Sequence, residues 1–372
     1  MKILVLNWQD IRNPLGGGAE VHLHEIFKRI AARGHAVTLF CSSFSGAPQE
    51  EIIDGIKIIR SGSRNLFNYG VRGYYKRRFR HESYDVVVDD INKIPFYTPL
   101  FVREPLVGIV HHLFGRSIFH QASLPAGLYV YGAEALVPPV YRHTPMAVVS
   151  ESSRNELIEK GFDEKNIAIV PNAVDTTLYR RLPGLQQEAQ VVGLLARLVK
   201  YKSVDHLLEA FTIVRKEMSD ARLLIVGDGD YRPALERKAI ELQLTGVTTF
   251  TGQVSGEEKV RLLNQMTVAV NCSAKEGWGL TVIEANACGV PVVASDVPGL
   301  RDAVLDEKTG LLYEYGNIEQ LAQKILLVLR DEQLRKRLTG EAITWAQSFR
   351  WEDSADKMIS VLERTIRENK RR

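Results

Sequence analysis

The stretch KEGWGLTVIEA (275–285) follows a continuous apolar run at 268–272 and opens a helical pattern. The apolar run predicts a strand buried on both faces of a parallel sheet, and the two glycines predict a turn from that strand into a helix. Glu276 then lies in the loop and Glu284 in the first turns of the helix. Such a strand–loop–helix unit predicts an α/β fold class, in which ligands bind at the carboxyl ends of the strands.

The same alternation of short apolar runs and helical patterns continues along the whole chain. Strands are expected at 2–8, 36–42, 56–60, 85–90, 106–112, 147–150 and 167–171, and again at 191–197, 222–227, 248–252, 268–272, 290–295 and 310–313. Helices are expected at 20–33, 205–216, 231–242 and 318–330. These strands exceed one Rossmann sheet, so we expect two Rossmann-like, doubly wound parallel-sheet domains.

A polar segment at 182–188, with Pro183 and Gly184, is the expected linker between them. It separates an N-terminal domain, residues 1–182, from a C-terminal domain, residues 189–351. Two such domains facing each other would hold a ligand in the cleft between them.

Length and composition exclude several classes of protein. The chain has 372 residues, of which 45% are apolar and 25% charged, as in ordinary globular proteins. A net charge of +3, from 48 basic and 45 acidic residues, does not favour a nucleic-acid partner. The three scattered cysteines (Cys41, Cys272 and Cys288) fit neither a disulfide framework nor a zinc site. With no apolar run long enough to span a membrane, we expect a cytoplasmic protein.

Two groups of residues are suited to hold phosphate. Gly16, Gly17 and Gly18 lie between the first strand and a helix, where close backbone approach and free N–H groups favour an anion. Arg197 and Lys202 follow the first strand of the second domain, and their charges suit a diphosphate without a metal. The ordinary alternatives are a flexible turn and a pair of solvated charges.

The remaining candidates each have an ordinary alternative as well. Glu276 is placed to hold sugar hydroxyls and Glu284 a ribose, although a helix-dipole acid and an unrelated loop acid fit equally. His111 ends a strand at the edge where chemistry is expected, or is a core histidine. The basic and aromatic residues at 72–80 form a solvated helix face or touch an anionic membrane.

Together these residues resemble a retaining glycosyltransferase of family GT4, with the GT-B fold. The resemblance covers nearly the whole chain. It includes the glycine loop, His111, the VPNAVD motif at 170–175, Arg197 with Lys202, and the pair Glu276 and Glu284. The motif FRWE at 349–352 is similar to the family's closing motif, which implies a final helix, residues 352–372, that crosses back to the N-terminal domain.

The resemblance also implies roles for these positions. Arg197 and Lys202 would neutralise the leaving diphosphate, Glu276 would bind the donor sugar, and Glu284 would bind the ribose. His111 would contact the sugar near its anomeric carbon. The remaining donor-binding positions would form the phosphate cradle and border the base; they are Gly16, Gly17, Gly18, Gly229, Val254, Gly277, Gly279, Leu280 and Thr281.

The resemblance therefore implies transfer of a hexose from a UDP- or GDP-linked donor to a glycan, glycolipid or lipid-linked acceptor. The N-terminal domain would bind that acceptor. No carboxylate is clearly placed as a covalent nucleophile, so we favour a front-face mechanism without metal or cofactor. The alternatives are a nucleotide-sugar epimerase or hydrolase of the same fold, and a non-catalytic nucleotide-sugar-binding protein. A dinucleotide fingerprint is absent, which argues against an NAD-dependent oxidoreductase.

Overall fold

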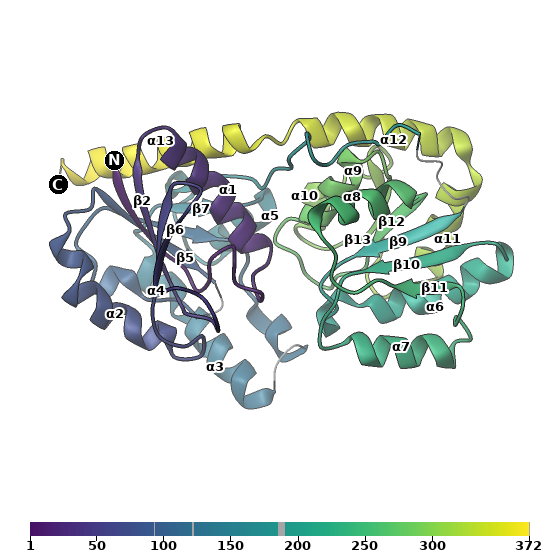
Figure 1. The fold of residues 1–372 in the computed structure, drawn as a ribbon, viewed down its shortest axis with the longest axis horizontal. Helices are drawn as coiled ribbons and strands as arrows, with labels where there is room; N and C mark the ends of the chain where they lie inside the picture. The colour runs from purple at the N-terminus through teal and green to yellow at the C-terminus, as the bar shows by residue number, and fades with distance from the viewer. Residues whose placement is uncertain (93, 121–122, 185–189, 372) are drawn as a thin grey trace. The chain divides into compact units, whose positions relative to one another are not determined.

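The computed structural model describes residues 1–92, 94–120, 123–184 and 190–371. They form two units: Met1–Asn172 with Trp351–Arg372, and Ala173–Arg350. Figure 1 shows each unit as a twisted sheet covered by helices.

Unit 1 is built on an eight-stranded sheet in the order β3-β4-β2-β1-β5-β6-β7-β8. Its strands are parallel except for the pair β3–β4. The strands are β1 (Lys2–Leu6), β2 (Ala36–Cys41), β3 (Glu50–Ile53), β4 (Ile56–Arg60), β5 (Val86–Ile91), β6 (Leu106–Val110), β7 (Met146–Val148) and β8 (Ile167–Ile169). The helices are α1 (Gly18–Ala32), α2 (Phe67–Arg77), α3 (Leu124–Ala135), α4 (Val137–Tyr141), α5 (Glu151–Glu159) and α13 (Trp351–Asn369).

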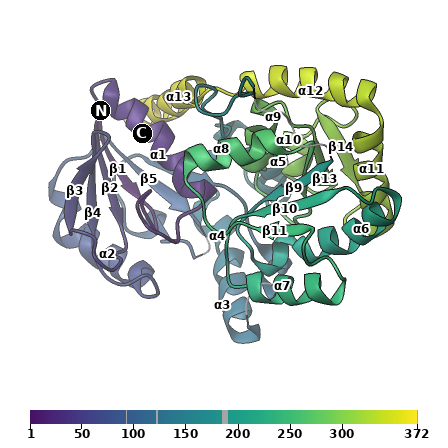
Figure 2. The ribbon, with the colours of Figure 1, turned by 45° about the vertical axis from the view of Figure 1, so that its right-hand side comes forward.

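Unit 2 is built on a six-stranded, wholly parallel sheet in the order β11-β10-β9-β12-β13-β14. Figure 1 labels β12, and Figure 2 labels the other five strands. The strands are β9 (Val191–Leu195), β10 (Arg222–Val226), β11 (Thr248–Phe250), β12 (Val268–Asn271), β13 (Val292–Ser295) and β14 (Gly310–Tyr313). The helices are α6 (Val204–Glu217), α7 (Arg232–Glu241), α8 (Gly256–Gln265), α9 (Leu280–Ala287), α10 (Leu300–Ala303), α11 (Ile318–Arg330) and α12 (Glu332–Gln347).

The expected alternation of strands and helices is present, and one strand was missed. Each predicted strand overlaps an observed one, because continuous Val, Ile and Leu runs bury both faces of a parallel strand. Strand β3 was not predicted. It forms a hairpin with β4 through Asp54 and Gly55, both of which have positive φ, 48° and 82°. An Asp-Gly pair is a strong sequence signal for such a turn.

The first division between the units lies before Ala173, upstream of the segment 182–188 that the sequence favoured as a linker. The segment after Ala173 belongs to unit 2 and is bonded to α8 of that unit. The Asn264 side chain accepts from the Leu182 N–H at 2.8 Å and donates to the Arg180 carbonyl at 3.0 Å. Residues 185–188 of the expected linker lie outside the described residues.

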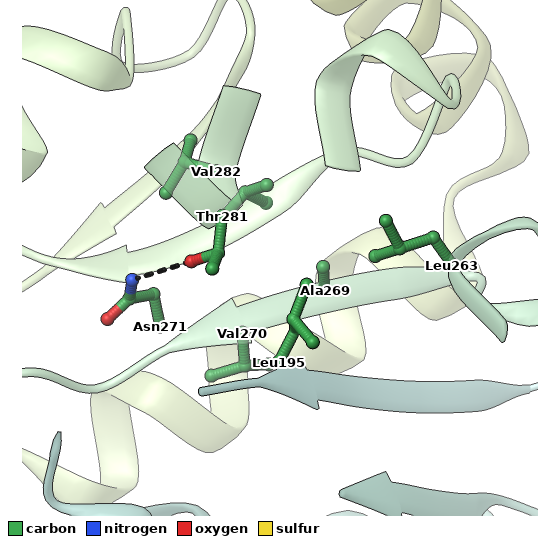
Figure 3. A pocket seen from close by; sticks show the side chains of 8 residues that line it. Leu195, Leu263, Ala269, Val270, Asn271, Thr281 and Val282 are labelled. Carbon is green, nitrogen blue, oxygen red and sulfur yellow. Dashed lines mark hydrogen bonds between the residues drawn. The ribbon is translucent and has the colours of Figure 1, made fainter. Parts of the chain in front are cut away.

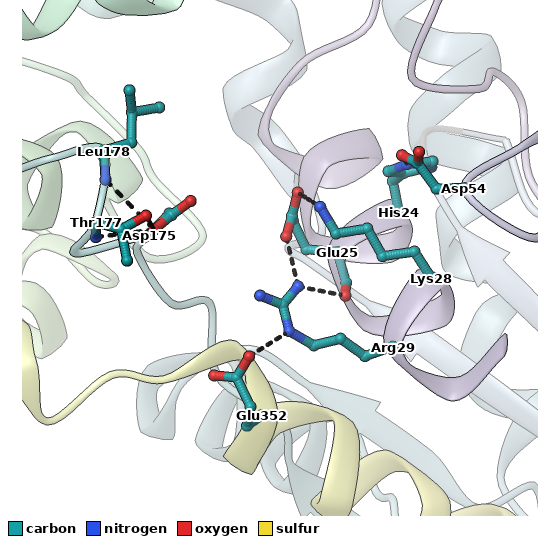
Figure 4. A network of polar contacts seen from close by, with 9 residues as sticks. All are labelled: His24, Glu25, Lys28, Arg29, Asp54, Asp175, Thr177, Leu178 and Glu352. Atoms are coloured by element: carbon teal, nitrogen blue, oxygen red, sulfur yellow. Dashed lines mark hydrogen bonds and ion pairs between the residues drawn. The ribbon is translucent and has the colours of Figure 1, made fainter. Parts of the chain in front are cut away.

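The final helix α13 belongs to unit 1 and packs against α1. Figure 4 shows Arg29 of α1 between Glu25 and Glu352, and its Nε donates to Glu352 at 2.8 Å. Ser354 donates to the Pro171 carbonyl at 2.8 Å, which fixes the start of α13 beside the end of the first sheet. The chain therefore returns to the first unit, as the closing motif implied.

Candidate functional site

The carboxyl edge of the unit 2 sheet brings Lys202 and Glu276 into an ion pair. Lys202 ends a short 3-10 turn (Lys200–Lys202) after β9, and Glu276 lies in the loop after β12. These two strands are neighbours in the sheet, so the loops that follow them meet at one edge. The Nζ of Lys202 donates to Oε1 of Glu276, and the Ser273 hydroxyl lies 2.8 Å from the same oxygen.

This pairing sets the charge of Lys202. Burial would lower the pKa of the Lys202 ammonium, but the Glu276 carboxylate outweighs it, so the pKa lies above the ordinary value. Both side chains are 15% exposed. Lys202 is therefore a fixed positive charge at a partly desolvated sheet edge, which is the arrangement that holds an anion. Arg197 is exposed in the loop that leads from β9 to this turn.

The Ser203 backbone holds Lys202 at the start of α6. Ser203 has φ 48° and ψ 41°, in the left-handed region that favours glycine. The Ser203 hydroxyl lies 2.9 Å from the Tyr315 hydroxyl. The serine therefore takes the backbone conformation that a glycine would take.

Glu284 lies in α9 and is 5% exposed. Its Oε1 accepts from Lys259 of α8 at 2.8 Å. Burial and the neighbouring Glu284 carboxylate raise the pKa of the Tyr179 phenol. Glu284 of α9 thus lies beside Lys259 of α8 and Tyr179. A hydroxyl-bearing ligand would compete with Lys259 for the Glu284 carboxylate oxygens.

The helix that carries Glu284 begins at a glycine, and its first turn is tied to the sheet. Gly279 is the N-cap residue with φ 82°, and Leu280 and Thr281 follow in the first turn. The amide of Asn271, at the end of β12, donates to the Thr281 hydroxyl at 3.5 Å (Figure 3). A cavity of about 10 Å³ lies beside this contact, enough for one water molecule. The first-turn N–H groups lack intrahelical acceptors and can serve an anion.

Gly229 and Val254 lie in the loops after β10 and β11. A Cβ atom at Gly229 would lie 2.2 Å from the Leu198 carbonyl oxygen, so the two loops require glycine there to approach closely. This packing supports the loop that carries Arg197. Gly277 lies next to Glu276 in the loop after β12.

In unit 1 the glycine loop contains a contact that the sequence interpretation missed. The Gly17 N–H donates to Oε2 of Glu20 at 2.6 Å, which caps the start of α1. Glu20 is buried, and burial raises the pKa of its carboxyl. Gly16 and Gly18 flank this capped position. One N–H of the expected phosphate cradle is therefore occupied by the chain's own side chain.

His111 follows β6 and is 7% exposed. Its Nε2 lies 3.2 Å from Oδ1 of Asp90, at the end of neighbouring β5, and the His22 ring packs edge-on against it at 5.1 Å. Burial would lower the pKa of His111, but the Asp90 charge and hydrogen bond raise it above the ordinary value. Burial, with the charge on His111, lowers the pKa of His22 to about 3. The Asp90 carboxylate therefore favours the protonated form of His111, whereas burial favours the neutral form of His22.

The segment 72–80 keeps its aromatic residues in the core. Tyr75 and Phe79 are buried, and Tyr74 stacks on Phe40 at 4.4 Å. The basic residues that remain exposed are Arg72, Lys76, Arg77 and Arg80. None of the helices in the described ranges has the length and apolar character needed to cross a membrane. The described part of the chain also contains no group of three or more His, Cys, Asp or Glu residues that could hold a metal ion.

Two family models match consecutive parts of the chain. The model "Glycosyl transferases group 1" matches residues 175–345, and "Glycosyltransferase Family 4" matches residues 16–178. The chain belongs to glycosyltransferase family 4.

Individual relatives agree with this assignment. A D-inositol 3-phosphate glycosyltransferase from Jonesia denitrificans is 36% identical over 49% of this chain and 45% of that protein. A GDP-mannose-dependent alpha-(1-6)-phosphatidylinositol monomannoside mannosyltransferase from Mycobacterium tuberculosis is 29% identical over 94% of this chain and 95% of that protein. Sucrose-phosphate synthase from Thermosynechococcus elongatus superposes with a TM-score of 0.81 at 21% identity, covering 98% of each chain. The glycosyltransferase therefore has the GT-B fold.

Sequence reasoning missed the partners of the candidate residues in this glycosyltransferase. Asp90 was placed in a strand and given no role, although it ends that strand beside a second acid, Asp89. Lys259 lies in α8, 25 residues before Glu284, so only the folded structure reveals the pair. Glu20 follows Gly17 by three residues, which is the spacing of a helix capping box.

Proposed function

We propose that this glycosyltransferase moves a hexose from a UDP- or GDP-linked donor to a glycan, glycolipid or lipid-linked acceptor, with retention of configuration. The observation that carries the proposal is the meeting of Lys202 and Glu276 at one sheet edge. A diphosphate is recognised by a cation and a sugar by a carboxylate, and the site offers both side by side. The relative from Mycobacterium tuberculosis, named for GDP-mannose and a phosphatidylinositol acceptor, supports the donor and acceptor classes.

The proposed reaction has one bond-exchange step on one face of the sugar. The bond from the anomeric carbon to the diphosphate oxygen breaks, and a bond to the acceptor oxygen forms on the same face. The acceptor's hydroxyl proton passes to the departing diphosphate oxygen. Lys202 and Arg197 stabilise the negative charge that develops on the diphosphate, so the step requires no metal ion.

In this proposal the other residues position the donor. Glu276 accepts hydrogen bonds from sugar hydroxyls and Glu284 from the ribose, while the N–H groups at Gly279, Leu280 and Thr281 face phosphate oxygens. His111, fixed by Asp90, contacts the sugar near its anomeric carbon. The remaining cradle residues named above border the phosphates and the base.

We also propose a cellular location for the enzyme. We place it in the cytoplasm, at the inner face of a membrane that presents a lipid-linked acceptor. The exposed cations of segment 72–80 support contact with anionic lipid, since each basic residue near such a surface contributes about 1 kcal/mol. Flotation with anionic liposomes tests this contact, which should weaken as salt rises.

The test of the donor site compares two lysines of the same turn. Lys202→Met should lower kcat by about 10²–10³-fold, because it removes one fixed charge from the developing diphosphate. Lys200→Met, two residues away and exposed, is the matched control and should retain wild-type turnover. Turnover is measured with UDP- and GDP-sugars in EDTA. Equal activity of the two variants, or a requirement for added divalent metal, would overturn the proposal.

A further inference from the structure

A second hollow lies within unit 1, between α2, α3 and the segment that follows β5. Its volume is about 300 Å³, at the lower end of the range of small-molecule pockets. Figures 1 and 2 both show α2 and α3 at the same end of this unit. Its lining includes Tyr69, Ile94, Phe96, Tyr97, Tyr129 and Ala133.

The polar atoms around this hollow bond to one another. The Tyr69 and Tyr129 hydroxyls lie 2.6 Å apart and join α2 to α3, and Asn68 donates to Tyr129 at 3.3 Å. The Tyr97 hydroxyl donates to the Ala133 carbonyl at 3.0 Å. The phenols thus have hydrogen-bond partners in the protein, so the lining presents mainly aromatic and aliphatic surface to a ligand.

Helix α3 also exposes large apolar side chains outside the pocket lining. Leu124, Leu128 and Leu136 are 66%, 55% and 51% exposed, respectively, at or next to this helix. Large apolar side chains gathered on one exposed element mark a surface that meets another apolar group. A hydrocarbon chain that extends beyond the pocket would cover some of this exposed apolar surface.

Two basic residues of α2 also lie near the pocket. Tyr69, Arg72 and Lys76 are spaced by three and four residues on α2, so they share one face of the helix. Both cations are exposed, and they follow the tyrosine that lines the pocket. Apolar surface beside fixed cations complements a hydrocarbon chain that ends in an anionic group.

The pocket is placed where an acceptor is needed. Helix α2 follows β4, the segment at 94–97 follows β5, and α3 follows β6, so the lining comes from the carboxyl ends of parallel strands. His111 follows β6 at the same edge of the same sheet. Ligands of open parallel sheets bind at this edge.

We propose that this pocket binds the hydrocarbon chain of an amphiphilic acceptor, whose anionic head group is held by Arg72 and Lys76. The inference rests on the proposed function, because it makes the glycosyltransferase's acceptor a single lipid-like molecule rather than a soluble glycan. It also assigns a role to Tyr129, which lines the pocket from the helix with the exposed leucines.

The experiment uses a series of n-alkyl phosphates with chains of four to twelve carbons, each kept monomeric. Binding to the full chain is measured by calorimetry. In the wild type each added methylene should tighten binding by up to about fourfold, which is ~0.8 kcal/mol, until the pocket is filled. Farnesyl phosphate and short-chain phosphatidic acid distinguish a prenyl from an acyl chain, and a preference for either supports the pocket.

Two tyrosines of α3 give a matched pair of variants. Tyr129→Ala should weaken binding of decyl phosphate about tenfold, whereas Tyr131→Ala, 40% exposed against 48% for Tyr129 but outside the lining, should change it less than twofold. Ala133→Phe fills the hollow and should flatten the dependence on chain length. Thermal unfolding confirms that each variant is folded.

The outcomes separate this inference from the donor proposal. Stabilisation by UDP- and GDP-sugars is measured in parallel with the same proteins. Donor binding without any dependence on alkyl chain length would overturn the pocket alone. Equal losses in Tyr129→Ala and Tyr131→Ala, or binding to vesicles but to no monomeric alkyl phosphate, would also overturn it. Absence of donor binding would overturn the donor proposal, while the alkyl series would still test the pocket.

Discussion

Substituting Gly299 by alanine should displace the loop that carries Glu276. Gly299 precedes α10 with φ 84°, and a Cβ atom there would lie 2.3 Å from the carbonyl oxygen of Glu276. The same Cβ would lie 2.8 Å from the carbonyl carbon. Contacts shorter than 3.0 Å are not tolerated, so the Glu276 backbone would have to move by about 0.7 Å.

Gly299→Ala should lose folding free energy for two reasons, the positive φ and the steric overlap, and a second glycine variant measures the first of these alone. A non-glycine residue at positive φ costs about 1–2 kcal/mol of folding free energy. Gly316 has φ 88° with no atom within 4 Å of its would-be Cβ, so Gly316→Ala carries that backbone cost alone. The overlap at Gly299 adds about 1–3 kcal/mol. Chemical denaturation of the two variants should therefore differ by that amount.

The functional consequence follows from the displacement. A misplacement of about 1 Å at a reacting centre can lower a rate by about 10²-fold, so Gly299→Ala should lower kcat/KM for the donor by about 10- to 100-fold. Gly316→Ala should remain within about twofold of wild type. Equal kcat/KM for the two folded variants would refute the conclusion that Gly299 positions Glu276.

Three further predictions concern buried or paired side chains. In the wild type the free energy of unfolding should fall by about 2 kcal/mol as the pH rises from about 4.5 to 6.5, and Asp89→Asn should abolish this fall. Burial raises the pKa of Asp89 from 3.8 to about 6, so in this window the folded chain keeps a proton that the unfolded chain releases; parallel denaturation curves for both proteins would contradict this. Lys259→Met should lower stability by about 3 kcal/mol and weaken donor binding, because it leaves the buried Glu284 without its cation; calorimetry measures the second effect, and wild-type affinity would argue against Glu284 as a ribose ligand. His111→Ala should lower kcat by about 10- to 100-fold with donor affinity nearly unchanged, whereas His112→Ala, its half-buried neighbour, should keep wild-type kcat; similar rates for both would remove His111 from the site.

The sheets could be predicted from sequence because parallel strands buried on both faces leave a continuous apolar signal. Strand β3 lacks that signal because it is a short edge strand of four residues, two of which are glutamates, and only its last residue is buried. Its prediction required attention to the Asp54-Gly55 turn. The division before Ala173 was not predictable either, because it depends on Asn264 bonding to the backbone of a segment some eighty residues earlier.

The candidate side chains could be predicted from the sequence, but their hydrogen-bond and ion-pair partners could not. Asp90 reaches His111 only because β5 and β6 pair with Ile91 opposite Val110, which places the residues at the two strand ends together. That register is a property of the assembled sheet. Glu20 was hidden for a different reason: its three-residue spacing from Gly17 marks a helix cap, and the glycines beside it suggested a phosphate loop instead.

In unit 2 each of the two acids is paired with a lysine, and these ion pairs affect which ligands the site can bind. Glu276 is engaged by Lys202, and Glu284 by Lys259. An anion that draws Lys202 away leaves Glu276 partly buried without its cation, which is costly. Free phosphate offers nothing in return, because it brings no hydroxyl groups to the carboxylate. In the proposed donor site a nucleotide sugar would supply both groups at once: its diphosphate for Lys202 and its sugar hydroxyls for Glu276. Under the proposed roles, the ion pair would favour a complete donor over its anionic fragment, through two side chains that the sequence places more than seventy residues apart.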